Sequence, residues 1–350
     1  MLGDLSFLEH KRVLITGGTG SLGKKLIRTI LDRCQTTVLI VYSRDEFKQY
    51  QFCSSLKDTE KKRLRFFLGD VRDLKRLKRA MERVDYVIHA AALKQVPAAE
   101  YNPFEFIKTN VIGAENVINA CIDSGIRNCV ALSTDKAANP INLYGATKLC
   151  SDKLFVSGNN YSGIKPARFS VVRYGNVVGS RGSVVPFFLR QRKTGNLPIT
   201  NYRMTRFWIT LEQGAALVLN ALRDMVGGEI WVPKIPSMKI TDLAKTIAPD
   251  CATKEIGIRP GEKLHEVMIP VDDGRYSIEF DDHFVILPQQ DFQSAMADQA
   301  FYLNKGGTAC SDDFVYGSDK NTIWLNEQQL TKMIAQLDLP EAQEWVAERS

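Results

Sequence analysis

The chain has 350 residues, of which 44% are hydrophobic and 25% are charged, proportions close to those of globular proteins. This composition excludes a disordered or fibrous chain, and no apolar run approaches the ~18 residues that a membrane helix needs. The seven cysteines form an odd, scattered set and the four histidines lie apart, so we expect reduced thiols, a cytoplasmic location and no metal site. The formal charge of +6 suits an anionic ligand.

The first half of the chain alternates short β-branched runs with helical patterns, which is typical of βαβ units around a parallel sheet. Six nearly continuous apolar runs are expected as strands that helices cover on both faces. They lie at residues 12–16, 37–42, 65–68, 86–90, 129–133 and 169–174. Between the fourth and the fifth, Pro103 to Gly125 has the pattern of a long apolar helix that ends at Gly125.

The composition of the sequence changes after Tyr174, where glycine, proline and arginine become more frequent. We therefore expect an α/β fold, with a Rossmann-type, doubly wound parallel sheet in residues 1–176 and a smaller, C-terminal substrate-binding lobe over most of residues 177–350. The run 229–232 has the pattern of a further strand, so segments within about 207–245 are expected to return to the core. The last ~50 residues carry too little pattern for a prediction.

A glycine-rich turn, TGGTGSLG, follows the first expected strand and precedes the helical pattern KKLIRTILDR. Such a turn lets backbone N–H groups face a pyrophosphate at a helix N-terminus, where the helix dipole favours negative charge. The spacing G-x-x-G-x-x-G differs from the G-x-G-x-x-G fingerprint, and the alternative is an ordinary strand–helix turn. Together with the βαβ pattern, the turn predicts a dinucleotide site. Its candidate residues are Gly17, Thr19, Gly20, Ser21, Leu22 and Gly23.

The end of the second strand bears on the choice of cofactor. Arg44 is suited to a 2′-phosphate, whereas the neighbouring Asp45 is suited to a ribose 2′-hydroxyl, so the spacing leaves both open. Arg44 comes first and Lys48 adds positive charge, which favours NADP, and the alternative is a solvated loop. Asp70 is placed to meet the adenine amino group, or else lies in a surface turn. The remaining cofactor candidates at the strand ends are Ser43, Val71, Ala90, Ala91, Ala92 and Lys94.

Tyr144 and Lys148 lie four residues apart, on one face of an expected helix. A nearby cation lowers the pKa of a phenol from ~10 toward neutrality, so the pair can act as a general acid and base. The same spacing at 161–165 and 316–320 is interpreted as chance, because neither copy follows a strand with hydroxyl side chains at its end.

Thr134, Asp135 and Lys136 follow the fifth strand, at the carboxyl edge where α/β proteins bind ligands. A carboxyl group and an amine side by side can form an acid–base couple. The alternative is an ion pair in a surface loop.

Four segments together carry a family resemblance: TGGTGSLG, HAAALKQVPAAEYNP, STDKAANPINLYGATK and RYGNVVGSRGSVVPFF. The chain resembles the extended short-chain dehydrogenase/reductases, and more closely the inverting UDP-N-acetylglucosamine 4,6-dehydratases of bacterial flagellin-sugar and capsule pathways. The similarity extends beyond Phe284 through RMTRFWIT and GIRPGEKLHEVMIP. Retaining dehydratases carry Asp-Glu in place of Asp135-Lys136, and 4-epimerases lack the couple. Tyr144 is Met in some large membrane-bound relatives, so this chain resembles the short soluble type.

The resemblance implies a role for each matching residue. Thr134 and Tyr144 would engage the sugar C4 oxygen, and Lys148 would contact the ribose and Tyr144. Asp135 would be the acid at the C6 hydroxyl, and Lys136 would be the base at C5. The residues implied to hold UDP-N-acetylglucosamine are Lys94, Ser133, Thr134, Asn176, Val177, Ser180, Arg181, Arg203, Arg206, Arg259 and Glu262.

The implied chemistry sets the protonation states. Lys136 can be a base only as a neutral amine, and we expect burial and the nearby Lys148 to lower its pKa. Asp135 must be protonated to act as an acid, so burial is expected to raise its pKa. The 5-inverted product would be UDP-2-acetamido-2,6-dideoxy-β-L-arabino-hex-4-ulose.

Other functions stay open at this point. A UDP-sugar 4-epimerase on the same core needs no C5 base, some related dehydratases add C3 epimerisation, and an NADP-sensing protein would need no catalysis. Nucleic-acid binding through the basic segment 72–79 is disfavoured, because the charges alternate with Asp and Leu at helical spacing. The expected binding partner is the nucleotide sugar UDP-N-acetylglucosamine, and we expect binding to neither nucleic acid nor membrane. Relatives associate through the helix that matches 103–125, so a homodimer or larger homo-oligomer is expected.

Overall fold

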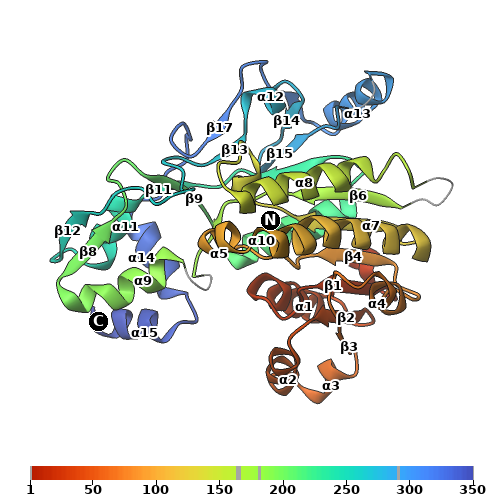
Figure 1. Cartoon of the computed structure of the whole chain (residues 1–350), viewed down its shortest axis with the longest axis horizontal. Coiled ribbons are helices and arrows are strands. Elements are labelled where there is room, and N and C mark those ends of the chain that lie inside the picture. Colours follow the sequence, from red (N-terminus) through yellow and green to blue (C-terminus); the bar gives the residue numbers. More distant parts are fainter. Residues whose placement is uncertain (1, 163–166, 180–182, 290–291, 350) are drawn as a thin grey trace.

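The computed structural model describes residues 2–162, 167–179, 183–289 and 292–349 (Figure 1). Within these ranges ten strands form one sheet in the order β16-β14-β15-β10-β6-β5-β4-β1-β2-β3. The strands from β3 to β10 in this order are parallel, and β15, β14 and β16 are antiparallel. The bounds are β1 Arg12–Thr16, β2 Val38–Ser43, β3 Leu64–Leu68, β4 Tyr86–His89, β5 Asn128–Leu132, β6 Arg168–Val172, β10 Ile230–Pro233, β14 Ser277–Glu279, β15 His283–Ile286 and β16 Thr308–Ala309. The predicted α/β, doubly wound class is confirmed.

Helices cover both faces of this sheet because successive residues of its strands point to opposite sides. In β1, Val13 and Ile15 pack in the cluster that contains α1 (Ser21–Arg33) and α10 (Leu211–Asp224). Leu14 packs in the opposite cluster. The helices of that second cluster are α4 (Leu74–Ala80), α7 (Gly113–Ser124) and α8 (Leu143–Ser157). Continuous apolar strands are thus buried on both faces, as expected.

The segment predicted as one long helix is interrupted by a π-helical turn. It consists of α6 (Pro103–Phe106), the π turn Ile107–Ile112 and α7. The buried Asn110 in the π turn accepts a hydrogen bond from the N–H of Leu93 and donates one to its carbonyl, both at 2.9 Å. The wider turn therefore holds the loop after β4 in place. Gly125 ends α7 in the left-handed conformation, at φ +68°.

The second part of the chain forms a lobe with three small sheets, two toward the left of Figure 1 and one near its top. In the first sheet, β9 (Thr205–Ile209) lies between β7 (Asn176–Val177) and β11 (Ser237–Lys239). The second sheet pairs β8 (Asn196–Ile199) with β12 (Ala252–Glu255), and the third pairs β13 (Val267–Ile269) with β17 (Tyr316–Gly317). The lobe helices are α9 (Val184–Gln191), α11 (Ile240–Ile247), α14 (Glu327–Ala335) and α15 (Pro340–Ala347). The remaining helices are α2 (Glu46–Ser54), α3 (Asp58–Lys61), α5 (Val96–Tyr101), α12 (Val271–Gly274) and α13 (Phe292–Asn304).

The chain crosses between the sheet and the lobe more than once. Residues 211–233 return to the large sheet as α10 and β10, and β14 to β16 return after residue 245 as well. The division into a core and a lobe near residue 176 stays a prediction.

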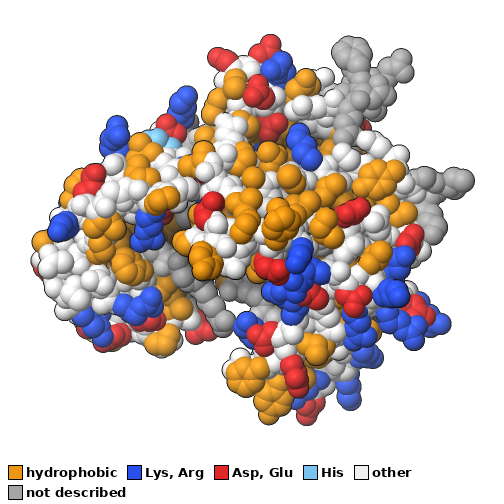
Figure 2. All heavy atoms as spheres, in the orientation of Figure 1, with side chains coloured by type: hydrophobic (Ala, Val, Ile, Leu, Met, Phe, Trp, Pro, Cys, Tyr) orange, Lys and Arg blue, Asp and Glu red, His pale blue; other side chains and the backbone are white. Residues whose placement is uncertain are grey.

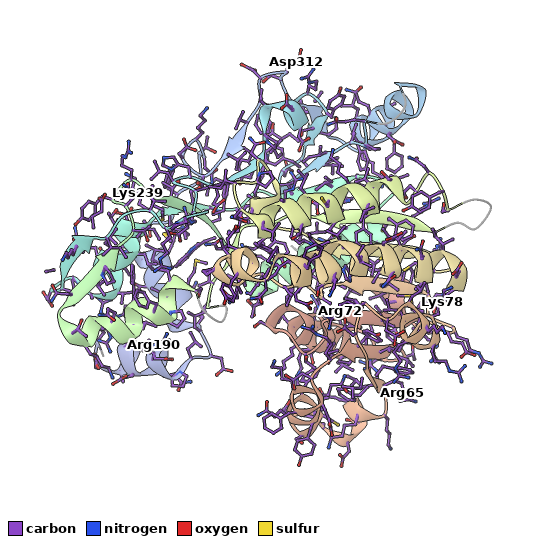
Figure 3. The ribbon with its side chains drawn as sticks, viewed as in Figure 1. Arg65, Arg72, Lys78, Arg190, Lys239 and Asp312 are labelled. Atoms are coloured by element: carbon purple, nitrogen blue, oxygen red, sulfur yellow. The ribbon has the colours of Figure 1, made fainter. Side chains whose placement is uncertain are left out.

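The C-terminal helices α14 and α15 pack on the lobe. The indole N–H of the buried Trp345 donates to the carbonyl of Ile247 at 2.8 Å. Arg190 of α9, labelled in Figure 3, pairs with Glu341 of α15 at 2.9 Å. The segment that carried no sequence pattern therefore supports α9 and α11.

Large apolar side chains are exposed on and beside the helices α5 to α8. Tyr101 is 87% exposed, Phe104 70%, Ile141 56% and Ile112 44%. Figure 2 shows hydrophobic side chains gathered across the middle of the face where α7 and α8 lie in Figure 1. A face of this kind favours association with another protein surface.

We predict a homodimer or larger homo-oligomer that uses this face. Phe104→Ser should lower the molar mass measured by light scattering at micromolar concentration. Ile256→Ser, which changes an exposed apolar residue of the lobe (50% exposed), should leave the mass unchanged. A monomeric wild-type protein would contradict the prediction.

Candidate active site

A cavity of about 920 Å³ opens along the carboxyl edge of the parallel strands and is lined by residues of both the sheet and the lobe. This edge is where open α/β sheets bind ligands. The predicted cofactor residues that line it are Gly17, Thr19, Gly20, Ser21, Leu22, Gly23, Ser43, Arg44, Lys48, Val71, Ala90, Ala91, Ala92, Lys94, Tyr144 and Lys148. The predicted substrate residues that line it are Lys94, Ser133, Thr134, Asn176, Val177, Arg206, Arg259 and Glu262.

The glycine-rich turn forms one end of this cavity. Gly17 has φ +65°, and a Cβ there would lie 2.9 Å from backbone atoms of Ala90 and Ala91. A Cβ on Gly23 would lie 2.7 Å from the carbonyl oxygen of Gly17. Helix α1 starts directly after Gly20, and among the described residues no side chain caps its first turn. The uncapped N-terminus beside the cavity therefore suits a phosphate group.

Charged side chains stand near the end of β2. Lys48 pairs with Asp45 at 2.7 Å, whereas Arg44 lies 3.6 Å from Asp70 and is half exposed. Asp70 does not line the cavity, and its carboxylate also accepts hydrogen bonds from Arg72 at 2.8 and 3.0 Å. Arg44 is thus the cation at this end with the weaker contact to a carboxylate.

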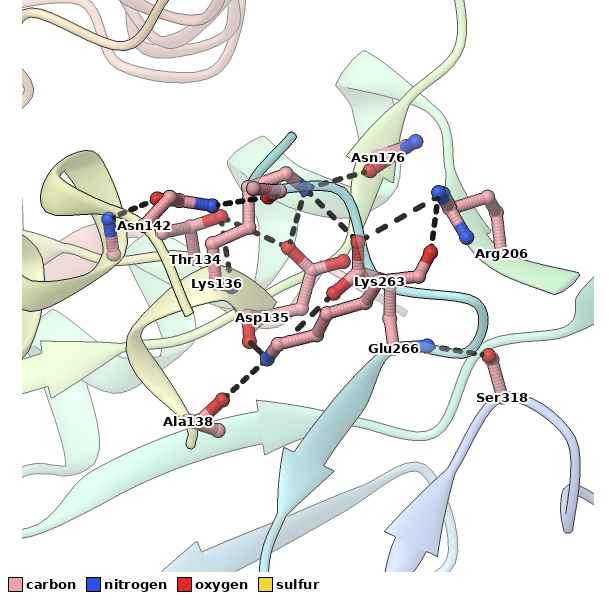
Figure 4. Close-up of polar contacts among 12 residues, drawn as sticks. Thr134, Asp135, Lys136, Ala138, Asn142, Asn176, Arg206, Lys263, Glu266 and Ser318 are labelled. Atoms are coloured by element: carbon pink, nitrogen blue, oxygen red, sulfur yellow. Dashed lines mark hydrogen bonds and ion pairs between the residues drawn. The ribbon is translucent and has the colours of Figure 1, made fainter. Parts of the chain in front are cut away.

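Thr134, Asp135 and Lys136 form a hydrogen-bonded group after β5 (Figure 4). The Thr134 hydroxyl donates to Asp135 Oδ1 at 2.9 Å, and Lys136 Nζ donates to the same oxygen at 3.0 Å. Thr134 and Lys136 line the cavity, but Asp135 is fully buried behind them. Its Oδ2 finds no hydrogen-bond partner in the described part of the chain. The carboxyl group of Asp135 is therefore connected to the cavity only by its hydrogen bonds with Thr134 and Lys136, among the described residues.

Glu266 and Lys263 join this group from the segment that leads into β13, and the sequence analysis did not select them. Glu266 is 2% exposed, with Oε1 3.5 Å from Lys136 Nζ and 3.7 Å from Arg206 Nε. Lys263 Nζ donates to the carbonyl of Ala138 at 2.6 Å. The only signal in the sequence was their place in the segment GIRPGEKLHEVMIP that carries the resemblance.

The expected fall in the pKa of Lys136 is wrong for this structure. Burial alone would lower it, but the carboxylates of Asp135 and Glu266 outweigh burial and raise the pKa above its ordinary value. The opposing cation is Arg206 rather than Lys148. The resting state is therefore an ammonium ion paired with carboxylates.

Tyr144 has a raised pKa, not the lowered one that the sequence suggested. Burial raises it to about 12, while the charge of Lys136 and a hydrogen bond with Thr134 act in the opposite direction. Burial lowers the pKa of Lys148, and Asp152 partly restores it. In the protein alone, Lys136 is thus the main cation that favours the Tyr144 phenolate.

Arg206 is buried, and its guanidinium already has several partners. Its Nη1 donates to the carbonyls of Thr205 and Leu264 at 2.7 and 3.1 Å, and Nη2 donates to that of Lys263 at 3.0 Å. Arg206 therefore holds the segment of Lys263 and Glu266 against β9.

Arg203 is the one predicted substrate residue of the described ranges that does not line the cavity. Arg203 is exposed in the turn between β8 and β9, away from the cavity lining. Ser180 and Arg181 lie outside the described residues.

The cavity also has walls that sequence reasoning missed. Phe187 and Phe188 of α9 and Met204 before β9 line its lobe side. Thr109 of the π turn lines it from the sheet side. Phe187 and Phe188 lie within the segment RYGNVVGSRGSVVPFF and Met204 within RMTRFWIT, so both places had a signal in the resemblance, whereas Thr109 had none.

In the described ranges no three His, Cys, Asp or Glu side chains group as metal ligands. Over the same residues, no helix has both the length and the apolar character needed to cross a membrane.

The family model described as "Polysaccharide biosynthesis protein" matches residues 13–288. The chain belongs to this family. It is 54% identical over 331 residues to a UDP-N-acetylglucosamine 4,6-dehydratase (inverting) of Campylobacter jejuni, covering 93% of this chain and 98% of that one. It is 37% identical to a UDP-glucose 4-epimerase of Rickettsia canadensis, covering 94% and 96% of the two chains. The X-ray structure of Pen from Bacillus thuringiensis matches with a TM-score of 0.84 and 34% identity, covering 94% and 98%.

The close packing of the glycine-rich turn predicts that Gly17→Ala destabilises the protein more than Gly125→Ala. Both glycines have similar positive φ values, but a Cβ on Gly125 meets nothing within 4 Å. Gly125→Ala should cost about 1–2 kcal/mol of the free energy of unfolding from backbone strain alone. Gly17→Ala should cost more, because the backbone of Ala90 and Ala91, just after β4, must move as well. Urea unfolding of both variants measures the difference, and equal losses would refute it.

Proposed function

We propose that the protein is an NADP-dependent, inverting UDP-N-acetylglucosamine 4,6-dehydratase, a hydro-lyase that acts in surface-polysaccharide or flagellin-glycan biosynthesis in the bacterial cytoplasm. The observation that carries this proposal is the Asp135–Lys136 pair, whose amine faces the same cavity as Tyr144. The Campylobacter relative supports the substrate and the inverting outcome.

The cavity fits a nicotinamide dinucleotide. The glycine-rich turn and the uncapped start of α1 would hold the pyrophosphate, and Tyr144 and Lys148 line the same cavity. When bound, this cofactor would accept hydride from C4 of the sugar and return it to C6, with no net consumption.

Tyr144 would take the proton of the C4 hydroxyl as C4 becomes a ketone. Its pKa of about 12 disfavours the phenolate, so cations must support this step. Lys136 does so in its charged form, and Lys148 lines the same cavity.

Lys136 would then remove the C5 proton, which is acidic only after C4 is a ketone. Moving one proton along the 3.0 Å hydrogen bond from Lys136 to Asp135 turns the ion pair into an amine and a carboxylic acid. The amine takes the C5 proton, and the carboxyl proton goes to the departing C6 hydroxyl, which leaves as water. The original ion pair is restored, so this step needs no external acid or base.

The second candidate function is a UDP-sugar 4-epimerase, which the relative from Rickettsia canadensis favours. An epimerase shares the C4 oxidation but has no use for a base at C5. Incubation with UDP-N-acetylglucosamine and mass spectrometry separates the two, because a dehydratase product has lost one water and an epimerase product has not.

The two chemical stages should separate by mutation. Lys136→Ala should still reduce the cofactor, seen by its near-ultraviolet absorbance, but more slowly, because one cation that favours the Tyr144 phenolate is gone. C5 exchange in D₂O should fall by about a hundredfold or more beyond that loss. Tyr144→Phe should block cofactor reduction itself. C5 exchange at the wild-type rate in Lys136→Ala would exclude Lys136 as the base.

Cofactor choice depends on Arg44 in this proposal. A charge-assisted hydrogen bond contributes about 1.5–3 kcal/mol, so Arg44→Ala should weaken NADP by about tenfold or more and leave NAD almost unchanged. Calorimetric titration measures both affinities. Arg65→Ala, on the neighbouring strand β3 and outside the cavity lining, is the matched control (Figure 3). Equal losses for both cofactors would refute this role.

A further inference from the structure

Among the described residues, Glu266 is the one carboxylate next to Lys136 that the proposed chemistry has not used. It is almost fully buried, at 2% exposure, and it comes from the lobe side of the chain. Lys136 comes from the turn after β5, so the contact joins two segments that are 130 residues apart in sequence.

Lys136 Nζ lies between two carboxylates, one closer to it than the other. Asp135 Oδ1 accepts a hydrogen bond from it at 3.0 Å, and Glu266 Oε1 lies 3.5 Å away. Asn176 Oδ1 accepts a longer hydrogen bond from the same Lys136 Nζ, at 3.4 Å. The other charged or titratable groups that act on this amine or feel its charge are Arg206, Lys263, Tyr144 and Lys94.

Glu266 is itself surrounded by cations. Its Oε1 lies 3.7 Å from Arg206 Nε, and its Oε2 lies 3.9 Å from Lys263 Nζ. Three positive groups therefore lie within 4 Å of this one buried carboxyl group. Asp135 has only Lys136 as a direct cationic partner within salt-bridge distance in the described structure.

We propose that Glu266 is a positioning residue that holds the side chain of Lys136 as an ammonium ion between two carboxylates, and that the amine becomes a base only by passing its proton to Asp135. This inference rests on the proposed dehydratase function. In the transfer an N–H bond of Lys136 breaks and an O–H bond forms on Asp135, so charge and protons balance inside the pair. Glu266 exchanges no proton in this transfer.

The arrangement gives Lys136 two uses in order. While it is an ammonium ion, its charge favours the Tyr144 phenolate that C4 oxidation needs. After the proton has moved to Asp135, the amine can act at C5. The Thr134 hydroxyl, which contacts Asp135 and lines the cavity, gives the carboxyl proton a path to the substrate. Glu266 therefore separates the two stages by keeping the first form dominant at rest.

The test is a direct titration of Lys136 in the whole protein without substrate. The protein is labelled with [ε-13C]lysine, and the signal of Lys136 is assigned by its absence in Lys136→Arg. In the wild type this signal should keep its ammonium position above pH ~10.4, the ordinary lysine pKa. In Glu266→Gln a nearby negative charge is gone, so the midpoint should move down by about one to three pH units.

Two variants complete the design. Glu279→Gln removes the carboxylate partner of Lys234, 2.7 Å away and outside the cavity lining, and should not move the Lys136 signal. Glu266→Asp keeps the charge at a greater distance and should shift the Lys136 midpoint less than Glu266→Gln does. The aspartate variant also serves as the test if the glutamine variant fails to fold.

A wild-type midpoint at or below pH ~10.4, or an unchanged midpoint in a folded Glu266 variant, would overturn the proposal. Because the titration needs no turnover, it stands apart from the dehydration assay. In a protein that does dehydrate the sugar, the pH profile of C5 exchange in Glu266→Gln should move to lower pH as well, by the same one to three units.

Discussion

An ammonium ion held by two buried carboxylates joins the sheet of this protein to its lobe. Lys136 follows β5, and Glu266, which lies 3.5 Å from its Nζ, precedes β13. Removing ions from water costs about several kcal/mol each, and only close contact among them offsets that cost. The catalytic turn and the lobe segment are therefore bound to each other, because separating them would leave unpaired charges in the interior.

A second buried ion pair fixes the helix that carries Tyr144 and Lys148. Asp152 of α8 accepts a hydrogen bond from the Ser133 hydroxyl at 2.7 Å and pairs with Arg173 at 3.4 Å. Arg173 also reaches Asp273 of α12 at 3.3 Å. The Arg173 side chain, which makes both contacts, is almost fully buried, at 2% exposure. The α8 helix is thus tied to β5, to the end of β6 and to the C-terminal half of the chain.

These two ion pairs explain why the cavity has a defined shape between parts that the chain visits several times. The glycine-rich turn supplies one rigid end, because Gly17 packs against the backbone after β4. The lobe supplies the other, with α9 supported by α11 and α15. A nucleotide sugar and a dinucleotide that meet in this cavity would contact both parts at once, which suits a reaction that must exclude water while protons move among few groups.

Local pattern along the chain was enough to predict the parallel strands, the glycine-rich turn, and the position of Tyr144, Lys148 and Thr134 to Lys136 at the carboxyl edge. Strand continuity and glycine spacing are local properties, and parallel strands bring their ends to one edge. The protonation state of Lys136 could be inferred only from the folded arrangement, because it depends on Glu266, which is 130 residues away in the chain. It likewise buried Asp135 behind its neighbours and turned the guanidinium of Arg206 toward backbone carbonyls. Charges act through space, so their balance could not be found from spacing along the sequence.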